Sequence, residues 1–158
     1  MFADCENLTG ELSFPSVSTI DMNSYGNNFR NCYKLTKVSF GHITQFGISN
    51  CYNNSNRGVL NGCTRLKIVD LGDSVENIYE SQFEGCSSLK AVIIRTNTVP
   101  TVYTTNKSWT RVFCNVSTIV YVPDVALSSY ISDTNYFGDN SNNVKPLSEY
   151  NEANILAS

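Results

Sequence analysis

The fold is decided by a stretch near the middle of the chain, FEGCSSLKAVII at residues 83–94. The same residue pattern recurs in LNGCTRLKIVDL at 60–71 and in FRNCYKLTKVSF at 29–40. Each copy has a large apolar residue, a Cys three positions later, a Leu three positions after that, and then a Val followed by a final apolar residue. Such self-similarity along a chain is the sequence signature of a repeat protein.

Two further copies flank these three. One opens the chain at Phe2 and Cys5, and a degenerate one opens at Phe113, where Val116 stands in the Cys position. The Cys residues of the first four copies are spaced by 27, 31 and 23 residues. In each unit, apolar residues at every second position follow the Leu, which predicts a short strand with one buried face. One unit cannot bury its apolar row alone, so stacked units are expected to share one continuous core and align their strands in a parallel sheet.

The pattern F-x-x-C-x-x-L-x-x-V-x-apolar, followed by V-x-x-I, resembles the BspA-type leucine-rich repeat. The 23-residue spacing between Cys63 and Cys86 equals the basic period of that family. Residues 112–137 look like its usual closing element, and the resemblance covers about residues 1–147. It implies a repeat solenoid, a right-handed leucine-rich-repeat coil with a short parallel sheet on one face and an irregular, turn-rich opposite face, ending in a short helix.

The chain divides into three segments on this interpretation. Residues 1–122 hold the repeats, about four full units plus the degenerate last one, and residues 123–147 form a C-terminal capping element. Residues 148–158 are a tail that trails off or belongs to a connection. A short helix is expected within 123–133, with Asp124 as its N-cap. The chain opens inside a repeat, and terminal repeats need capping. We therefore expect a fragment of a longer array or a neighbouring chain at this uncapped edge, although residues 1–7 could improvise a cap.

Four of the six Cys residues occupy one repeat position, which favours a ladder of small buried side chains. Neighbouring coils lie close enough for disulfides, but equivalent positions in a row are set by packing rather than by pairing. Cys51 lies in an inserted loop and is the expected exposed thiol. No CxxC pair is present and His42 is the single histidine, so no metal or cofactor is expected.

The remaining composition argues against several function classes. The net charge of −3 gives no reason to expect nucleic acid, and no apolar run is long enough to insert into a membrane. No phosphate-binding loop or calcium loop occurs, and nothing places a third partner beside His42 and Cys51 for nucleophilic catalysis. The opening residues have no secretory signal. We expect a binding protein and not an enzyme.

Two surfaces are candidates for binding. On the sheet face, residues alternating with the core row are expected to point outward, and in the C-terminal half they are apolar: Ile68, Ile93 and Tyr121. A contiguous exposed apolar patch tends to mark an interaction site. Scattered surface residues without a role, or a cover formed by the loop at 138–147, are the alternatives.

The second surface is the set of long loops at 21–28, 47–58 and 101–111. All three interrupt the repeat at one equivalent point, so stacking places them on one flank. Their Tyr, Asn, Ser and Gly content is like that of antibody paratopes, although loops without a binding role would look similar. The aromatic residues expected to anchor a partner are Tyr25, Tyr52, Tyr103 and Trp109.

The resemblance implies a non-catalytic adhesion module of a bacterial surface or secreted protein, binding a host, matrix or cell-surface protein, or a glycan, through the sheet face and the loops. A cell-surface or secreted location fits the missing signal only for a fragment of a longer protein. The alternative is a structural or receptor-binding component of a larger assembly, such as a phage virion.

Overall fold

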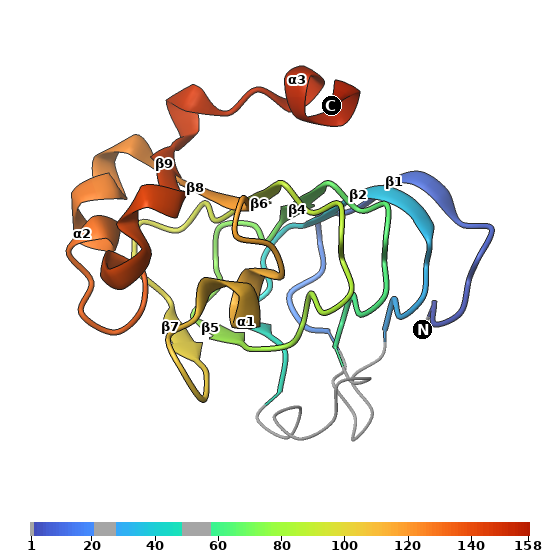
Figure 1. Ribbon diagram of the computed structural model, residues 1–158, viewed down its shortest axis with the longest axis horizontal. Helices are drawn as coiled ribbons and strands as arrows, with labels where there is room; N and C mark the ends of the chain where they lie inside the picture. Colours follow the sequence, from blue (N-terminus) through green and yellow to red (C-terminus); the bar gives the residue numbers. More distant parts are fainter. Residues whose placement is uncertain (1, 21–27, 49–57) are drawn as a thin grey trace.

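The computed structural model describes residues 2–20, 28–48 and 58–158. Its chain coils into a solenoid whose N-terminal end and C-terminal cap lie at opposite ends (Figure 1). Among the described residues, a parallel six-stranded sheet has the order β1-β2-β4-β6-β8-β9. Its strands are β1 (Thr9–Phe14), β2 (Lys34–Phe40), β4 (Ile68–Asp70), β6 (Ala91–Ile93), β8 (Ile119–Val122) and β9 (Val144–Pro146). The predicted repeat solenoid is confirmed.

The register of this sheet stacks equivalent repeat positions in rows. Val38, Val69, Val92 and Val120 are direct neighbours across four strands and are fully buried. Successive residues of a strand point to opposite faces. The residues on either side of each Val therefore form two rows on the outer face, one of which runs through Lys37, Ile68, Ala91 and Ile119.

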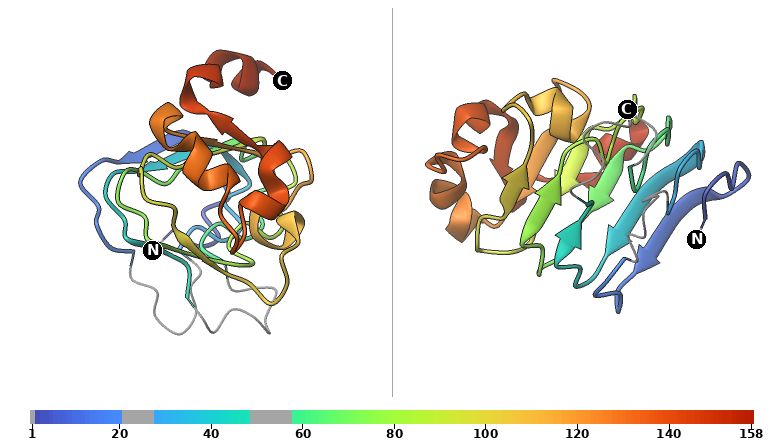
Figure 2. Two further views of the ribbon diagram at one scale, coloured as in Figure 1. Left: turned by 90° about the vertical axis from the view of Figure 1, so that its left-hand side faces the viewer. Right: turned by 90° about the horizontal axis from the view of Figure 1, so that it is seen from below.

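The opposite face is more regular than we expected. Beneath the main sheet lies a second parallel sheet of three short strands, β3 (Gln45–Phe46), β5 (Asn77–Tyr79) and β7 (Thr101–Tyr103) (Figure 2). Phe46, Ile78 and Val102 pair in register, and the first two are fully buried. The V-x-x-I pattern of the sequence marks these strands, because its Ile position supplies their inward side chains.

A tight turn begins each unit. The residues directly before the four ladder Cys are Asp4, Asn31, Gly62 and Gly85, and all four have φ between 59° and 78°. Gly adopts this left-handed region freely, and Asn and Asp adopt it more readily than other residues. At Gly85 an added Cβ would lie 3.2 Å from the backbone of Gly62, so the coils also approach closely there. The repeat therefore selects small or turn-forming residues at this position.

The C-terminal end is closed by helical segments. Helix η2 (Asp124–Ala126) runs into α2 (Leu127–Ile131), as the sequence predicts for 123–133, and η3 (Gly138–Asn143) follows. The predicted N-cap was wrong, because Pro123 takes that position and the Asp124 carboxylate instead accepts a hydrogen bond from the Ser148 backbone N–H at 3.0 Å. The expected loop at 101–111 instead contains β7 and the start of helix α1 (Trp109–Phe113). That loop prediction was wrong because Trp109, Val112 and Phe113 are core residues, spaced for the inner face of a helical turn.

The tail does not trail off. After β9 the chain forms η4 (Leu147–Glu149) and α3 (Glu152–Ala157), and this segment returns over the outer face of the main sheet (Figure 1). The Asn151 side chain caps α3 by accepting a hydrogen bond from the Asn154 backbone N–H at 3.0 Å. The last residues therefore cover the sheet face rather than leaving the domain.

Candidate protein-interaction surfaces

The cysteine ladder is a structural feature. Cys32, Cys63 and Cys86 are fully buried, and each thiol donates a hydrogen bond of 3.0–3.1 Å to the backbone carbonyl that opens the preceding unit. Among the described residues every Cys is a free thiol. Burial raises the pKa of the Cys63 thiol to about 12, so it is inert at neutral pH. Cys51 lies outside the described residues.

The last rung of the ladder differs from the prediction. Val116 does not take the Cys position, because its side chain is 76% exposed. Asn115 makes the contacts with the preceding coil instead, donating from Nδ2 to the carbonyls of Cys86 and Leu89 at 3.2 and 3.0 Å. A polar side chain suits this place because it satisfies carbonyls at the end of the ladder.

The apolar half of the outer sheet face is not exposed as we predicted. Ile68 and Ala91 are fully buried, and Ile93 is 1% exposed. The side chains that cover them come from β8 and from the tail: Tyr121, Leu147, Tyr150, Ile155 and Leu156. Tyr121 is half-buried and packs edge-to-face on Tyr150, with ring centroids 5.2 Å apart. The cover is thus residues 147–156, which share only Leu147 with the loop at 138–147.

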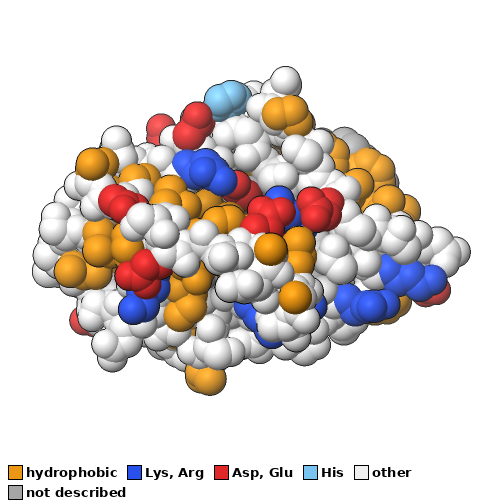
Figure 3. All heavy atoms as spheres, turned by 90° about the horizontal axis from the view of Figure 1, so that it is seen from above, with side chains coloured by type: hydrophobic (Ala, Val, Ile, Leu, Met, Phe, Trp, Pro, Cys, Tyr) orange, Lys and Arg blue, Asp and Glu red, His pale blue; other side chains and the backbone are white. Residues whose placement is uncertain are grey.

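Charged side chains fasten the tail to this face. Lys37 on β2 lies 2.5 Å from Glu152, Lys67 donates to the Leu156 carbonyl at 2.6 Å, and Lys90 donates to Ser158 Oγ at 2.7 Å. The Lys37 hydrogen bond holds the pKa of Glu152 below its ordinary value, although partial burial opposes this. Figure 3 views this side and shows side chains of both charge signs interspersed with apolar ones.

The loop flank contains the other four predicted residues, Tyr25, Tyr52, Tyr103 and Trp109. Tyr25 and Tyr52 lie outside the described residues. Trp109 is 6% exposed, and its indole N–H donates to the Thr118 carbonyl at 3.0 Å. Its ring stacks on Tyr136 of the cap, with centroids 5.8 Å apart. The expectation that Trp109 is an exposed anchor was wrong, because this side chain joins the last coil to the cap.

Tyr103 is exposed, with 40% of its surface accessible. It stacks on Tyr79 of the neighbouring strand with ring centroids 4.7 Å apart and an interplanar angle of 11°. Sequence reasoning missed Tyr79, although its place one residue after Ile78 matches that of Tyr103 after Val102. The two rings form a flat aromatic surface on the second sheet.

A buried carboxylate holds the loop beside these rings. Glu80 is fully buried and accepts hydrogen bonds from Thr104 Oγ1 at 2.6 Å and from the Thr105 backbone N–H at 2.7 Å, while Arg111 lies 3.4 Å away. Burial acts to raise the pKa of Glu80, but these hydrogen bonds and the Arg111 charge hold it below the ordinary value. The position of the loop after Tyr103 is therefore fixed from inside the fold.

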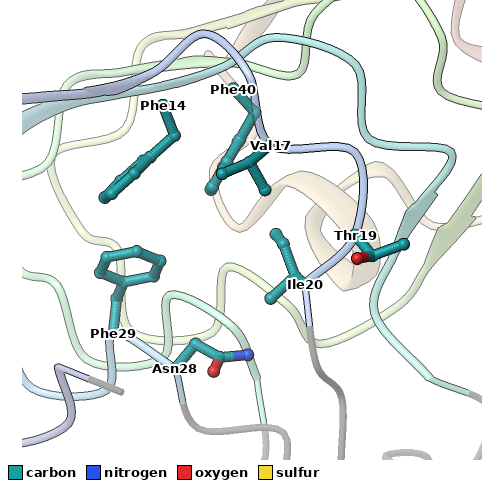
Figure 4. A pocket seen from close by; sticks show the side chains of 7 residues that line it. All are labelled: Phe14, Val17, Thr19, Ile20, Asn28, Phe29 and Phe40. Carbon is teal, nitrogen blue, oxygen red and sulfur yellow. The ribbon is translucent and has the colours of Figure 1, made fainter.

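The N-terminal end of the solenoid is hollowed. A cavity of about 110 Å³ is lined by Phe14, Val17, Ile20, Phe29 and Phe40, with Thr19 and Asn28 at its edge. Figure 4 shows the apolar side chains turned toward this space. Phe14, Val17 and Ile20 are only half-buried, whereas equivalent residues of inner units are at most 5% exposed. This edge is the least covered part of the apolar core.

The described residues show little that could support catalysis. His42 Nδ1 lies 2.8 Å from Asp73 Oδ1, but Ser74 hydrogen bonds the same carboxylate and not the imidazole. Hydrogen bonds from Ser74 and His42 lower the pKa of Asp73, as in an ordinary surface turn. Residues 2–20, 28–48 and 58–158 contain no group of three or more potential metal ligands. The helices within these ranges are also too short or too polar to span a membrane.

A comparison with known protein families identifies the same repeats along the chain. The family described as "BspA type Leucine rich repeat region" matches residues 1–142 in six copies. The sequence pattern predicts five units, counting the degenerate one. A search of curated proteins finds no match for this chain. The chain belongs to the BspA-type leucine-rich repeat family, whose members are typically non-catalytic, surface-associated protein-binding modules.

Proposed function

We propose that this chain is a non-catalytic adhesion module of a bacterial surface or secreted protein. It binds a host, matrix or cell-surface protein, or a glycan, and the surface centred on Tyr103 makes the contact. Family membership supports the binding role, and the exposed tyrosine pair supports its location. The same family supports placing the module at the bacterial surface.

The observation that carries this proposal is the Tyr79–Tyr103 stack. Tyrosine supplies a large, rigid contact area at low entropic cost and is enriched in binding surfaces. Two residues close to Tyr103 in the sequence, Thr101 and Asn106, are also exposed and polar, and their side chains can hydrogen bond a protein or a sugar. Because Glu80 anchors Thr104 and Thr105, the surface is already ordered before a partner arrives.

The test compares two single variants with the unchanged protein on immobilised matrix proteins and on a glycan array. Tyr103→Ser should weaken the strongest interaction at least tenfold, as expected for a central aromatic contact. Tyr33→Ser is the matched control because Tyr33 is 37% exposed but lies at the turn that opens the second unit. Equal losses in both variants would contradict the proposed location.

A second candidate function, a component of a larger assembly such as a phage virion, is favoured by the open N-terminal end. Half-buried Phe14, Val17 and Ile20 line an apolar cavity there, which a neighbouring chain could cover. Light scattering distinguishes the two functions. A monomer of 17.5 kDa supports the adhesion module, and a larger species that Phe14→Asp dissociates supports the assembly.

A further inference from the structure

The outer sheet face and the tail differ in how well they are buried against one another. On the body, Ile68, Ala91 and Ile93 are at most 1% exposed. On the tail, the side chains that cover them, Leu147, Tyr150, Ile155 and Leu156, are all only half-buried, and α3 contains no buried residue. A segment with few buried contacts is drawn from the least stable part of a fold. The tail is therefore expected to detach from this face more readily than the solenoid unfolds.

The face beneath the tail has the chemistry of a peptide-binding site. Its centre is the apolar cluster Ile68, Ala91 and Ile93. Three lysines from neighbouring units bind the tail from this face. Lys37 pairs with a carboxylate of the tail, that of Glu152, and Lys67 and Lys90 donate hydrogen bonds to acceptors in the last three residues. Cations at the C-terminal end of a helix are favourable because the last carbonyls are unpaired and the helix dipole is negative there.

The side chains of the tail that contact this face show which features a ligand of the face needs. In α3, Glu152, Ile155 and Leu156 are half-buried and Ala153 and Asn154 are exposed, so one helical face meets the sheet. Tyr150 precedes that face and donates from its hydroxyl to Glu152 Oε2 at 3.1 Å. An occupant thus needs an aromatic residue, an acidic residue two positions later, and two apolar residues at the end of a short helix.

We propose that residues 147–158 are a displaceable intramolecular ligand of the outer sheet face, and that this face binds an acidic amphipathic peptide segment of a partner protein. The proposal rests on the binding role proposed above and adds a second surface and a partner class to it. A tethered segment competes at an effective concentration in the millimolar range. The tail therefore keeps the face closed to weak ligands and admits segments that bind better than it does.

The test uses a fluorescent peptide of residues 147–158, acetylated and amidated, titrated with two forms of the full chain. One is the unchanged protein, and the other carries Tyr150→Ser and Ile155→Asp, which release the tail without altering the face. The peptide should bind the release variant at least ten times more tightly than the unchanged chain. A control peptide carrying Ile155→Asp should bind neither form.

A charge exchange tests the orientation of the ligand. Adding Lys37→Glu to the release variant should weaken binding of the natural peptide, and a Glu152→Lys peptide should restore it. Equal binding of the natural and control peptides, or equal affinity for the two forms of the chain, would overturn the proposal. These results involve neither Tyr103 nor any matrix protein, so their failure is separate from failure of the adhesion function.

Hydrogen exchange on the unchanged chain gives a readout that needs no variant to fold. The amides of Ile155 and Ser158, bonded to Asn151 and Asn154, should exchange much faster than those of β4 and β6. Protection of α3 equal to that of the sheet would show that the tail opens only with global unfolding, and the proposal would be wrong.

Discussion

The two ends of the solenoid are built from the same repeat, yet their cores are covered very differently. At the C-terminal end, Tyr130, Tyr136 and Phe137 of the cap are fully buried against the last coil. At the N-terminal end, Phe14 and Val17 remain half-buried and line a cavity. The difference shows that a unit of this repeat completes its core only when something packs on both of its sides.

The largest effect is expected for removal of a cap side chain. Tyr136 stacks on Trp109, and its hydroxyl donates to the Ser108 carbonyl at 3.1 Å. Tyr136→Ala should lower the free energy of unfolding by about 3–5 kcal/mol, the range for a large buried aromatic residue. Urea unfolding followed by circular dichroism measures this. Tyr33→Ala, at an exposed tyrosine, is the control, and similar losses in both variants would contradict the proposed role of the cap.

The second-largest effect on stability is expected for the buried carboxylate Glu80, and it depends on pH. Glu80, buried beneath the C-terminal coils, has a lowered pKa, so it stabilises the fold above its ordinary pKa and that stability is lost as pH falls through its folded pKa. Glu80→Gln should cost about 1–3 kcal/mol at pH 7, the range for a buried charged hydrogen-bond network that is disrupted. The unfolding midpoint should also depend less on pH below about pH 4.3, the ordinary value for Glu.

The control lies at the other end. Asp4 also has a lowered pKa, from hydrogen bonds with Asn31 and Arg30, but it is exposed to solvent. Solvent screens such a pair, so Asp4→Asn should leave the pH dependence of the midpoint almost unchanged. A larger change for Asp4→Asn than for Glu80→Gln would show that the N-terminal turn limits acid stability.

How far the sequence predicts this molecule follows from the same contrast. Positions that recur in each unit, such as Cys63 and Val69, can be predicted as core positions from the sequence, because neighbouring coils give them the same buried environment. Trp109 and Ile68 were misassigned because their burial depends on the cap and the tail, which lie outside the repeat pattern. The tail's few apolar residues look like a disordered end until the face that they cover is known. The repeat pattern does not predict contacts that occur only once between segments distant in the sequence.

A moderate effect is expected at the open end. Phe14 stacks on Phe40 at 5.9 Å but is only half-buried. Because less apolar surface leaves water there on folding, Phe14→Ala should cost about 1–2 kcal/mol in urea unfolding, well below the Tyr136→Ala value. A loss as large as that of Tyr136→Ala would mean that the N-terminal edge is covered in solution, and a concentration-dependent midpoint would identify a second copy as the cover.

The smallest effect is expected for the first rung of the cysteine ladder. Cys5 is half-buried, whereas Cys63 is fully buried and donates to the Phe29 carbonyl at 3.0 Å. Cys63→Ala should cost about 1–2 kcal/mol and Cys5→Ala about 0.5 kcal/mol or less, since the cost scales with the apolar contact removed. Both are measured by urea unfolding under reducing conditions. Equal costs would mean that Cys5 also has a neighbour on its open side, so the smallest variant gives the most direct measure of whether this end is covered.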